Sequence, residues 1–175
     1  MLWLADALEA IRDFMNLGGP VLRAIAVTIF IMWVLIVERI IFFRSSMKMM
    51  SREIHDNWES RPERQSWNAK QIRELMISRF SEAANRGINV IQTLVALCPL
   101  LGLLGTVTGM ISVFQVMAVS GSGNVRAMAA GVSQATVPTM AGMVGALSGV
   151  LLITLLSRRA SHEVEFLEDS LTMDH

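Results

Sequence analysis

The sequence predicts an all-α integral membrane protein with three transmembrane helices that continue as helices outside the bilayer. Of its 175 residues, 53% are hydrophobic. No charged residue lies between Arg86 and Arg126, or between Arg126 and Arg158. At about 1.5 Å per residue, a helix over either interval is longer than the ~30 Å hydrocarbon core. A soluble protein with two buried core helices is the alternative, but such helices rarely run past ~20 residues without a charge.

Residues 1–20 precede the first span and are typical of an amphipathic helix followed by a turn. Apolar residues share one face at helical spacing: Leu4, Leu8, Ile11 and Met15. A helix of this kind binds in the plane of a membrane surface, here the outer one. The Gly-Gly-Pro run at 18–20 predicts a turn that directs the chain into the bilayer.

Residues 21–43 form the first predicted span, although its uncharged core is only 24–37. The helix can cross if Arg23 extends to the interface and Glu38 pairs with Arg39 or with a neighbouring helix. A cleaved signal peptide is the competing interpretation. It fits poorly, because the residues before the apolar run are acidic where a signal peptide is basic.

The distribution of Lys and Arg predicts the orientation. The segment 44–86, between the first two spans, holds Arg44, Lys48, Arg52, Arg61, Arg64, Lys70, Arg73, Arg79 and Arg86. The loop 120–128, between the last two spans, has only Arg126. The positive-inside rule therefore places 44–86 and the carboxyl terminus in the cytoplasm, and the amino terminus and 120–128 in the periplasm.

The segments predicted to be cytoplasmic are helical. Apolar residues recur at helical spacing in 72–83 and again in the carboxyl-terminal segment 158–175. We expect both to continue membrane helices into the cytoplasm and to pack on each other. The Arg-Pro-Glu step at 61–63 predicts a break before the first of them.

The second span (87–119) combines a proline with closely spaced small residues. Gly102, Gly105 and Gly109 recur at three- and four-residue spacings, which lets a neighbouring backbone approach. Pro99 has no amide hydrogen, so the carbonyl four residues before it lacks its helical partner.

The third span (129–157) repeats this chemistry. Gly142 is one of several small residues, and Pro138 leaves the carbonyl of Gln134 without its helical partner. Thr136 and Thr139 adjoin this proline. Ordinary packing, with each hydroxyl bonded to its own helix, is the simpler interpretation for one threonine. Because prolines, an amide and hydroxyls concentrate on two spans, we favour a polar path or a buried partner helix.

These motifs resemble those of a known family. The run 99–109, PLLGLLGTVTG, and the run 131–142, GVSQATVPTMAG, are similar to the second- and third-span motifs of the ExbB/TolQ/MotA proton-channel family. Glu38–Arg39 at the inner end of the first span also fits. Within the family, the chain most resembles the short ExbB proteins of a second TonB system. Gln134 stands where ExbB and TolQ usually carry a glutamate, and Pro138 is also unusual at its position.

The resemblance implies a motor in the bacterial cytoplasmic (inner) membrane. ExbB-like subunits form a pentamer around the transmembrane helices of an ExbD-like single-span partner. Proton flow then drives force transmission through a TonB-like protein, which powers import of iron chelates or similar nutrients across the outer membrane. Thr106 and Thr139 correspond to pore-facing threonines, and we include Gln134 among the pore-lining residues. The partner's helix supplies an aspartate.

Other classes of function are not indicated. The three histidines lie in predicted cytoplasmic segments without a helical ligand pair, so we expect no metal site. No phosphate-binding loop or nucleophile–base set occurs, so we expect neither an enzyme nor a cofactor, and we expect no nucleic-acid partner. The basic loop can contact anionic membrane lipid.

Three functional hypotheses follow. The favoured one is the channel-forming subunit of a TonB-energising motor, and the second is the TolQ or flagellar counterpart. The flagellar version is disfavoured because MotA has four spans. The third is a non-conducting scaffold for partner helices, which Gln134 favours because an amide cannot titrate. A homo-oligomer is expected in each case, because faces rich in small residues are buried only against other helices.

Overall fold

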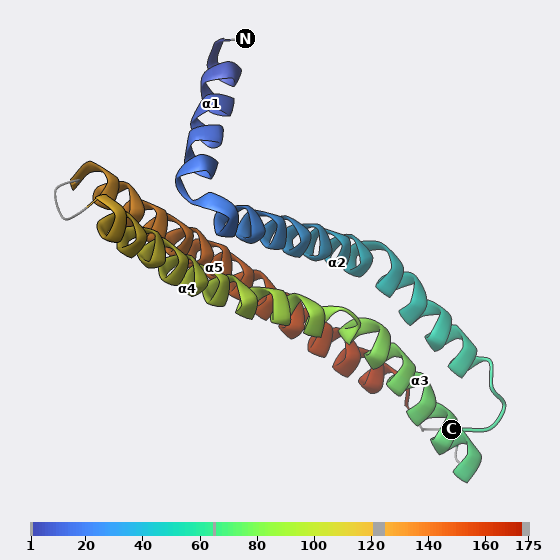
Figure 1. Ribbon diagram of the computed structural model, residues 1–175. Coiled ribbons are helices and arrows are strands. Elements are labelled where there is room, and N and C mark those ends of the chain that lie inside the picture. Colours follow the sequence, from blue (N-terminus) through green and yellow to red (C-terminus); the bar gives the residue numbers. More distant parts are fainter. Residues whose placement is uncertain (1, 65, 121–124, 173–175) are drawn as a thin grey trace. The chain divides into compact units, whose positions relative to one another are not determined.

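The computed structural model describes residues 2–64, 66–120 and 125–172, except the side chains of residues 2–5, 7, 8 and 120. Within these ranges the chain is helical and contains no strand. The helices are α1 (Leu2–Leu17), α2 (Gly19–Glu59), α3 (Trp67–Asn85), α4 (Ile88–Ser120) and α5 (Val125–Ser170) (Figure 1).

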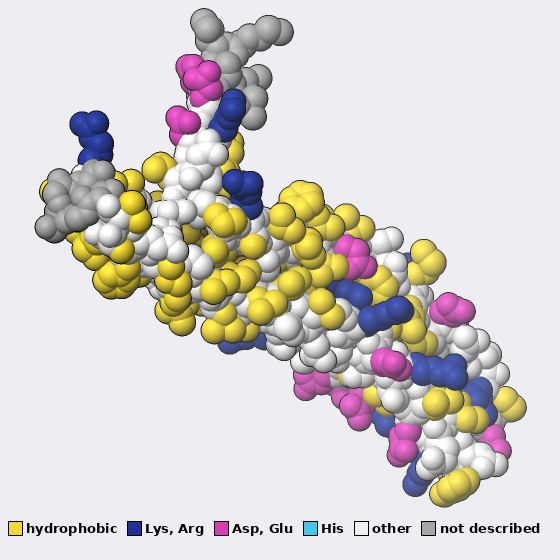
Figure 2. All heavy atoms as spheres, viewed as in Figure 1, with side chains coloured by type: hydrophobic (Ala, Val, Ile, Leu, Met, Phe, Trp, Pro, Cys, Tyr) yellow, Lys and Arg dark blue, Asp and Glu magenta, His cyan; other side chains and the backbone are white. Residues whose placement is uncertain are grey.

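Three stretches are long and apolar enough to cross a membrane: 19–59, 67–119 and 125–170. This confirms the predicted all-α fold class with three long apolar helices. The described residues form two compact units, the first from 1–33 and 93–150 and the second from 34–92 and 151–175. In the face shown in Figure 2, hydrophobic side chains cover most of the first unit, whereas acidic and basic side chains are frequent on the second.

The first unit begins with a turn between α1 and α2. Gly19 has a φ of +63°, in the left-handed region that a residue without a side chain adopts readily. The two helices point in different directions on either side of this turn (Figure 1). The predicted helix and turn at 1–20 thus have a counterpart in α1 and Gly19, although the side chains of Leu4 and Leu8 lie outside the described residues.

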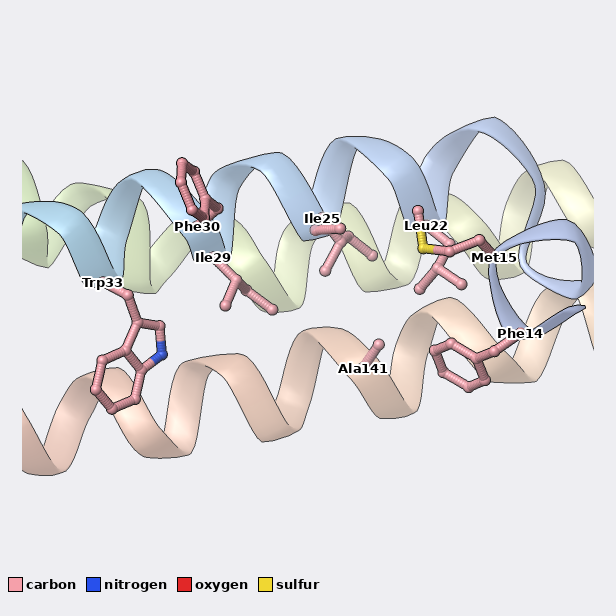
Figure 3. A pocket seen from close by; sticks show the side chains of 9 residues that line it. Phe14, Met15, Leu22, Ile25, Ile29, Phe30, Trp33 and Ala141 are labelled. Carbon is pink, nitrogen blue, oxygen red and sulfur yellow. The ribbon is translucent and has the colours of Figure 1, made fainter. Parts of the chain in front are cut away.

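An apolar groove of about 430 Å³ runs along α2 in the first unit. Leu22, Ile25 and Ile29 of α2 line it opposite Ala141 of α5, and Phe14 of α1 closes one end (Figure 3). Leu22 and Ile25 are buried. The start of α2 therefore packs on α5 through aliphatic side chains.

The second unit has a core of its own around the end of α5. Trp58, Phe80 and Leu167 are buried, one from each of α2, α3 and α5. Arg73 of α3 donates hydrogen bonds to the carbonyls of Glu168 (2.7 Å) and Leu171 (2.8 Å). These contacts show that α3 and the end of α5 pack on each other, as the sequence predicts.

The Trp58 indole also donates, to the carbonyl of Thr172 at 2.9 Å. Thr172 lies just beyond α5, and the last carbonyls of a helix have no partner within it, so side chains of α2 and α3 supply donors to this end of the helix and to the residues that follow it. Hydrogen bonds as well as apolar packing therefore hold the end of α5 in the second unit.

The helix boundaries of the second unit follow local signals in part. α2 ends at Glu59, before the proline that predicts a break, and the Ser66 hydroxyl accepts a hydrogen bond from the Ala69 amide at the start of α3. The prediction that the helix at 72–83 continues without a break into the membrane helix is wrong. A turn at Gly87, with a φ of +79°, separates α3 from α4.

α4 lies within one residue of its predicted span at each end, whereas α5 is longer than the predicted span 129–157. α5 runs to Ser170 without interruption. It begins at Val125, inside the predicted loop 120–128, of which residues 121–124 lie outside the described residues.

Candidate functional site: the contact between α4 and α5

Glycines bring the backbones of α4 and α5 close together within the first unit, where the two helices lie side by side (Figure 1). A Cβ atom added at Gly109 would lie 2.5 Å from the Cβ atom of Ala135 and 2.6 Å from its Cα atom. A Cβ atom added at Gly142 would lie 2.5 Å from the carbonyl oxygen of Cys98. No side chain fits at either glycine without separating the helices.

The middle of this contact is built on a buried proline. Pro138 is almost completely buried, and a Cβ atom at Gly105 would lie 2.5 Å from its ring. Pro138 lacks an amide hydrogen, so it cannot donate to the carbonyl of Gln134 in the usual helical bond. The proline ring thus occupies the space that the absent side chain of Gly105 leaves open.

One hydroxyl crosses from helix to helix at this point. The Thr139 hydroxyl oxygen lies 3.0 Å from the Gly102 carbonyl oxygen and 3.3 Å from the Ala135 carbonyl oxygen in its own helix. A Cβ atom added at Gly102 would lie 3.1 Å from the Thr139 Cα atom. The missing side chain at Gly102 therefore makes room for the threonine to reach the other backbone.

The other threonine hydroxyls of the contact donate within their own helices. Thr106 donates to the Leu103 carbonyl at 2.7 Å, and Thr108 to the Gly105 carbonyl at 3.0 Å. Thr136 lies 3.2 Å from the Val132 carbonyl and is exposed. Bonds of this kind satisfy a hydroxyl without a neighbour and leave its two lone pairs free to accept.

Gln134 lies at the amino-terminal side of this contact, against the turn between α1 and α2. Its side-chain nitrogen is 2.7 Å from the position that a Cβ atom on Gly19 would take. It also lines a cavity of about 320 Å³ together with Asn16 and Ser112. Two amides and a hydroxyl therefore face one small space between α1, α4 and α5.

The side chains of α4, and those of α5 before Arg158, offer hydrogen bonding but no carboxyl, imidazole or amine group. The sequence has no Asp, Glu, His or Lys in 87–125 or in 127–157. In the described residues, no three side chains among His, Cys, Asp and Glu lie close enough together to hold a metal ion. Hydroxyls and amides can orient water or a carboxyl group, but a proton that is bound and released at membrane depth needs another group.

The structure thus brings together most of the residues that the sequence singles out, at the α4–α5 contact: Gly102, Gly105, Gly109, Pro138, Thr139 and Gly142. Thr106 bonds to its own helix, Pro99 is exposed, and Gln134 lies apart from Thr139, beside Gly19. The sequence predicts a turn at Gly19 but not its contact with Gln134, and it gives no signal for Asn16 as a neighbour of Gln134.

The profile of the MotA/TolQ/ExbB proton channel family matches residues 38–169, which is most of the chain. The chain belongs to this family. The matched part of the chain includes all of α3 and α4 and all but the last residue of α5. It leaves out α1.

A relative in Synechocystis has the name biopolymer transport protein ExbB-like 1. The two proteins are 37% identical over 84 residues, which is 46% of this chain and 33% of the relative. The aligned segment thus spans about a third of the length of that proton-channel family relative.

Proposed function

We propose that this proton-channel family member is the ExbB-like, channel-forming subunit of a motor that works with an ExbD-like single-span partner and a TonB-like protein. On this proposal the motor powers import of iron chelates or similar nutrients across the outer membrane. Family membership and the ExbB-like relative support it.

One observation carries the division of labour that we propose. The stretches 87–125 and 127–157, which include all of α4 and the part of α5 before Arg158, contain no side chain that can take up and release a proton near neutral pH. The moving proton therefore needs a carboxyl group from another chain. We assign that group to the partner's transmembrane helix and regard α4 and α5 as a polar sleeve around it.

Within this sleeve we assign the ion path to Thr106, Thr139 and Gln134. The lone pairs of both hydroxyls remain available to accept hydrogen bonds from water or from a protonated carboxyl group. The close contact of α4 and α5 at Gly109 and Gly142 supports a wall that excludes lipid and keeps these groups at fixed positions.

We place the protein in the inner membrane with its amino terminus in the periplasm. Nine Lys and Arg residues in 44–86, against one in 120–128, support this orientation. Segment 44–86 and the end of α5 then lie in the cytoplasm.

Proton flux in sealed vesicles tests the proposal. Vesicles would contain this protein alone, with an ExbD-like partner, or with the partner carrying Asp→Asn in its transmembrane helix. Flux is expected only with the unmodified partner, because only then is a titratable group present at membrane depth. Substantial flux from this protein alone would contradict the sleeve model.

The same preparation distinguishes the alternatives. A complex that assembles with its partner but never conducts would favour a scaffold, a role consistent with the position of Gln134 against Gly19. If the single-span protein that co-purifies with this chain comes from the Tol system, the TolQ-like assignment replaces the ExbB-like one.

A further inference from the structure

A buried arginine of the second unit lies against the turn between α3 and α4. Arg39 of α2 is only 7% exposed. Its guanidinium group packs on Gly87, where an added Cβ atom would lie 3.1 Å from Nε and 3.2 Å from Nη2. The left-handed glycine of the turn therefore leaves just enough room for this cation.

The charge of Arg39 is poorly compensated within the chain. Its nearest carboxylate oxygen, on Glu38, is 3.6 Å from Nε, and the Glu38 side chain is 56% exposed. Nη1 reaches the Ala83 carbonyl only at 3.5 Å, and Nε is buried without a hydrogen-bond partner. Burying a cation is costly unless an anion or good hydrogen bonds compensate it. The exposed Glu38 carboxylate at 3.6 Å and the Phe42 ring, whose centroid lies 5.1 Å from the guanidinium carbon, are therefore weak partners for this buried cation.

Arg39 lines a pocket of about 250 Å³ together with the exposed Glu38, and the pocket has charged side chains of both signs and an apolar wall. Arg86 is exposed at the rim, while Leu35, Val90 and Ile91 supply the wall. An adjoining pocket of about 860 Å³ shares Arg86 and Val90 with it.

Arg79 and Glu82 also line this adjoining pocket. In the described part of the chain, neither Arg79 nor Arg86 has a carboxylate within ion-pair distance. Three arginines and two glutamates, Glu38 and Glu82, thus line two pockets that share residues, which leaves an excess of positive charge.

We propose that these adjoining pockets bind the phosphate head group of an anionic phospholipid, with Arg39 and Arg86 as its cationic partners and Arg79 close by. The site lies where the last charges before a long uncharged stretch occur, since no charged residue follows Arg86 until Arg126. Residues at such a boundary meet lipid head groups, and the apolar wall suits the first carbons of an acyl chain. The proposal requires α4 to cross a bilayer, but it does not depend on proton conduction.

Lipid titration of the detergent-purified full chain, followed by native mass spectrometry, tests this site. The ligands are short-chain phosphatidylglycerol, phosphatidylcholine of the same chain length, and inorganic phosphate. We expect phosphatidylglycerol to bind in preference to both. The double variant R79Q/R86Q is expected to weaken phosphatidylglycerol binding about tenfold or more, through loss of charge-assisted hydrogen bonds.

The matched control is R158Q/R159Q, which removes two exposed arginines directly after the other uncharged stretch, 127–157, and should leave the affinity unchanged. Equal binding of the two phospholipids, or an equal loss in the control, would overturn the proposal. Binding of inorganic phosphate as tight as that of the lipid would make the site one for a free anion. A smaller assembly mass for R79Q/R86Q, without a change in lipid affinity, would make the pocket a subunit contact instead.

Discussion

At the scale of single residues, glycines, which have no side chain, determine how closely α4 and α5 approach each other. Gly109 faces Ala135, Gly105 faces the ring of Pro138, and Gly102 faces Thr139. Each glycine gives up helix propensity, by roughly 1 kcal/mol relative to alanine in a soluble helix. In return the backbones approach closely enough for the Thr139 hydroxyl to reach a carbonyl of the other helix.

Gly109→Ala is expected to destabilise the protein by about 1–3 kcal/mol, because the new methyl group would overlap the backbone of Ala135. Thermal unfolding in detergent, followed by circular dichroism, measures the loss. Ala96→Ser is the control, since it also adds one heavy atom to α4 but at an exposed position. Equal melting temperatures for the two variants would show that the close contact is absent in solution.

Thr139→Val keeps the shape of the side chain and removes the hydroxyl that reaches Gly102. We expect a loss of about 0.5–1 kcal/mol in stability and a fall in partner-dependent uptake of an iron chelate. Thr106→Val is expected to lower uptake without the same loss of stability, because its hydroxyl donates only within α4.

Thr108→Val is the control for both threonine variants, since Thr108 also donates within α4 and is not assigned to the ion path. Equal uptake by all three variants would mean that these hydroxyls serve packing alone.

At the scale of helices, the sequence patterns predict that a helix exists better than they predict the residues at which it begins and ends. Charge-free intervals predict the apolar parts of α4 and α5, because a charge within the bilayer is costly. The break after α2 follows from Pro62. The turn at Gly87 is not foreseeable in the same way, because the residues around it also suit a continuous helix and Arg39, which packs on it, is distant in sequence.

The hydrogen bond from Thr139 to Gly102 could not be predicted either. A helical pattern tells which residues share a face, but the register between two helices depends on how all their side chains interlock. Gln134 illustrates the same limit. Its sequence position suggests an ion path, while its contact with Gly19 depends on where the turn before α2 lies.

The carboxyl end of α5 depends on donors from another helix. Arg73→Ala removes the two hydrogen bonds to the carbonyls of Glu168 and Leu171 and should destabilise this end by about 1–3 kcal/mol. Amide hydrogen exchange over 160–172 should become faster. Lys70→Ala, an exposed position on α3, is the control and should leave the exchange rates unchanged. Equal rates in both variants would show that Arg73 does not hold the end of the helix.

At the scale of the whole molecule, much apolar surface of the predicted spans is not buried within one chain. In the most apolar segment of each of the three spanning stretches, only 22%, 28% and 33% of the residues are buried within the chain. Phe30, Leu147 and Leu151 are among the large exposed side chains. Lipid or other protein chains must cover this surface. The small residues on the same helices favour packing against another protein chain over packing against lipid.

A closed homo-oligomer is therefore expected, as the sequence also suggests. Native mass spectrometry of the detergent-purified protein should show several copies in each complex, and the family resemblance implies five. A uniform monomer over a range of mild detergents would contradict this expectation. Light scattering with correction for bound detergent provides an independent mass.

The fluorescence of Trp58 can report whether the end of α5 is packed in its place. Among the described tryptophan side chains, Trp33 and Trp67 are exposed, whereas Trp58 is 1% exposed and bonded to the Thr172 carbonyl. With the other tryptophans replaced by phenylalanine, the remaining indole should emit at short wavelength and resist quenching by iodide. Removal of the residues after Asp169 by truncation, or displacement of the end of α5 by a partner that competes for this core, should shift the emission to the red.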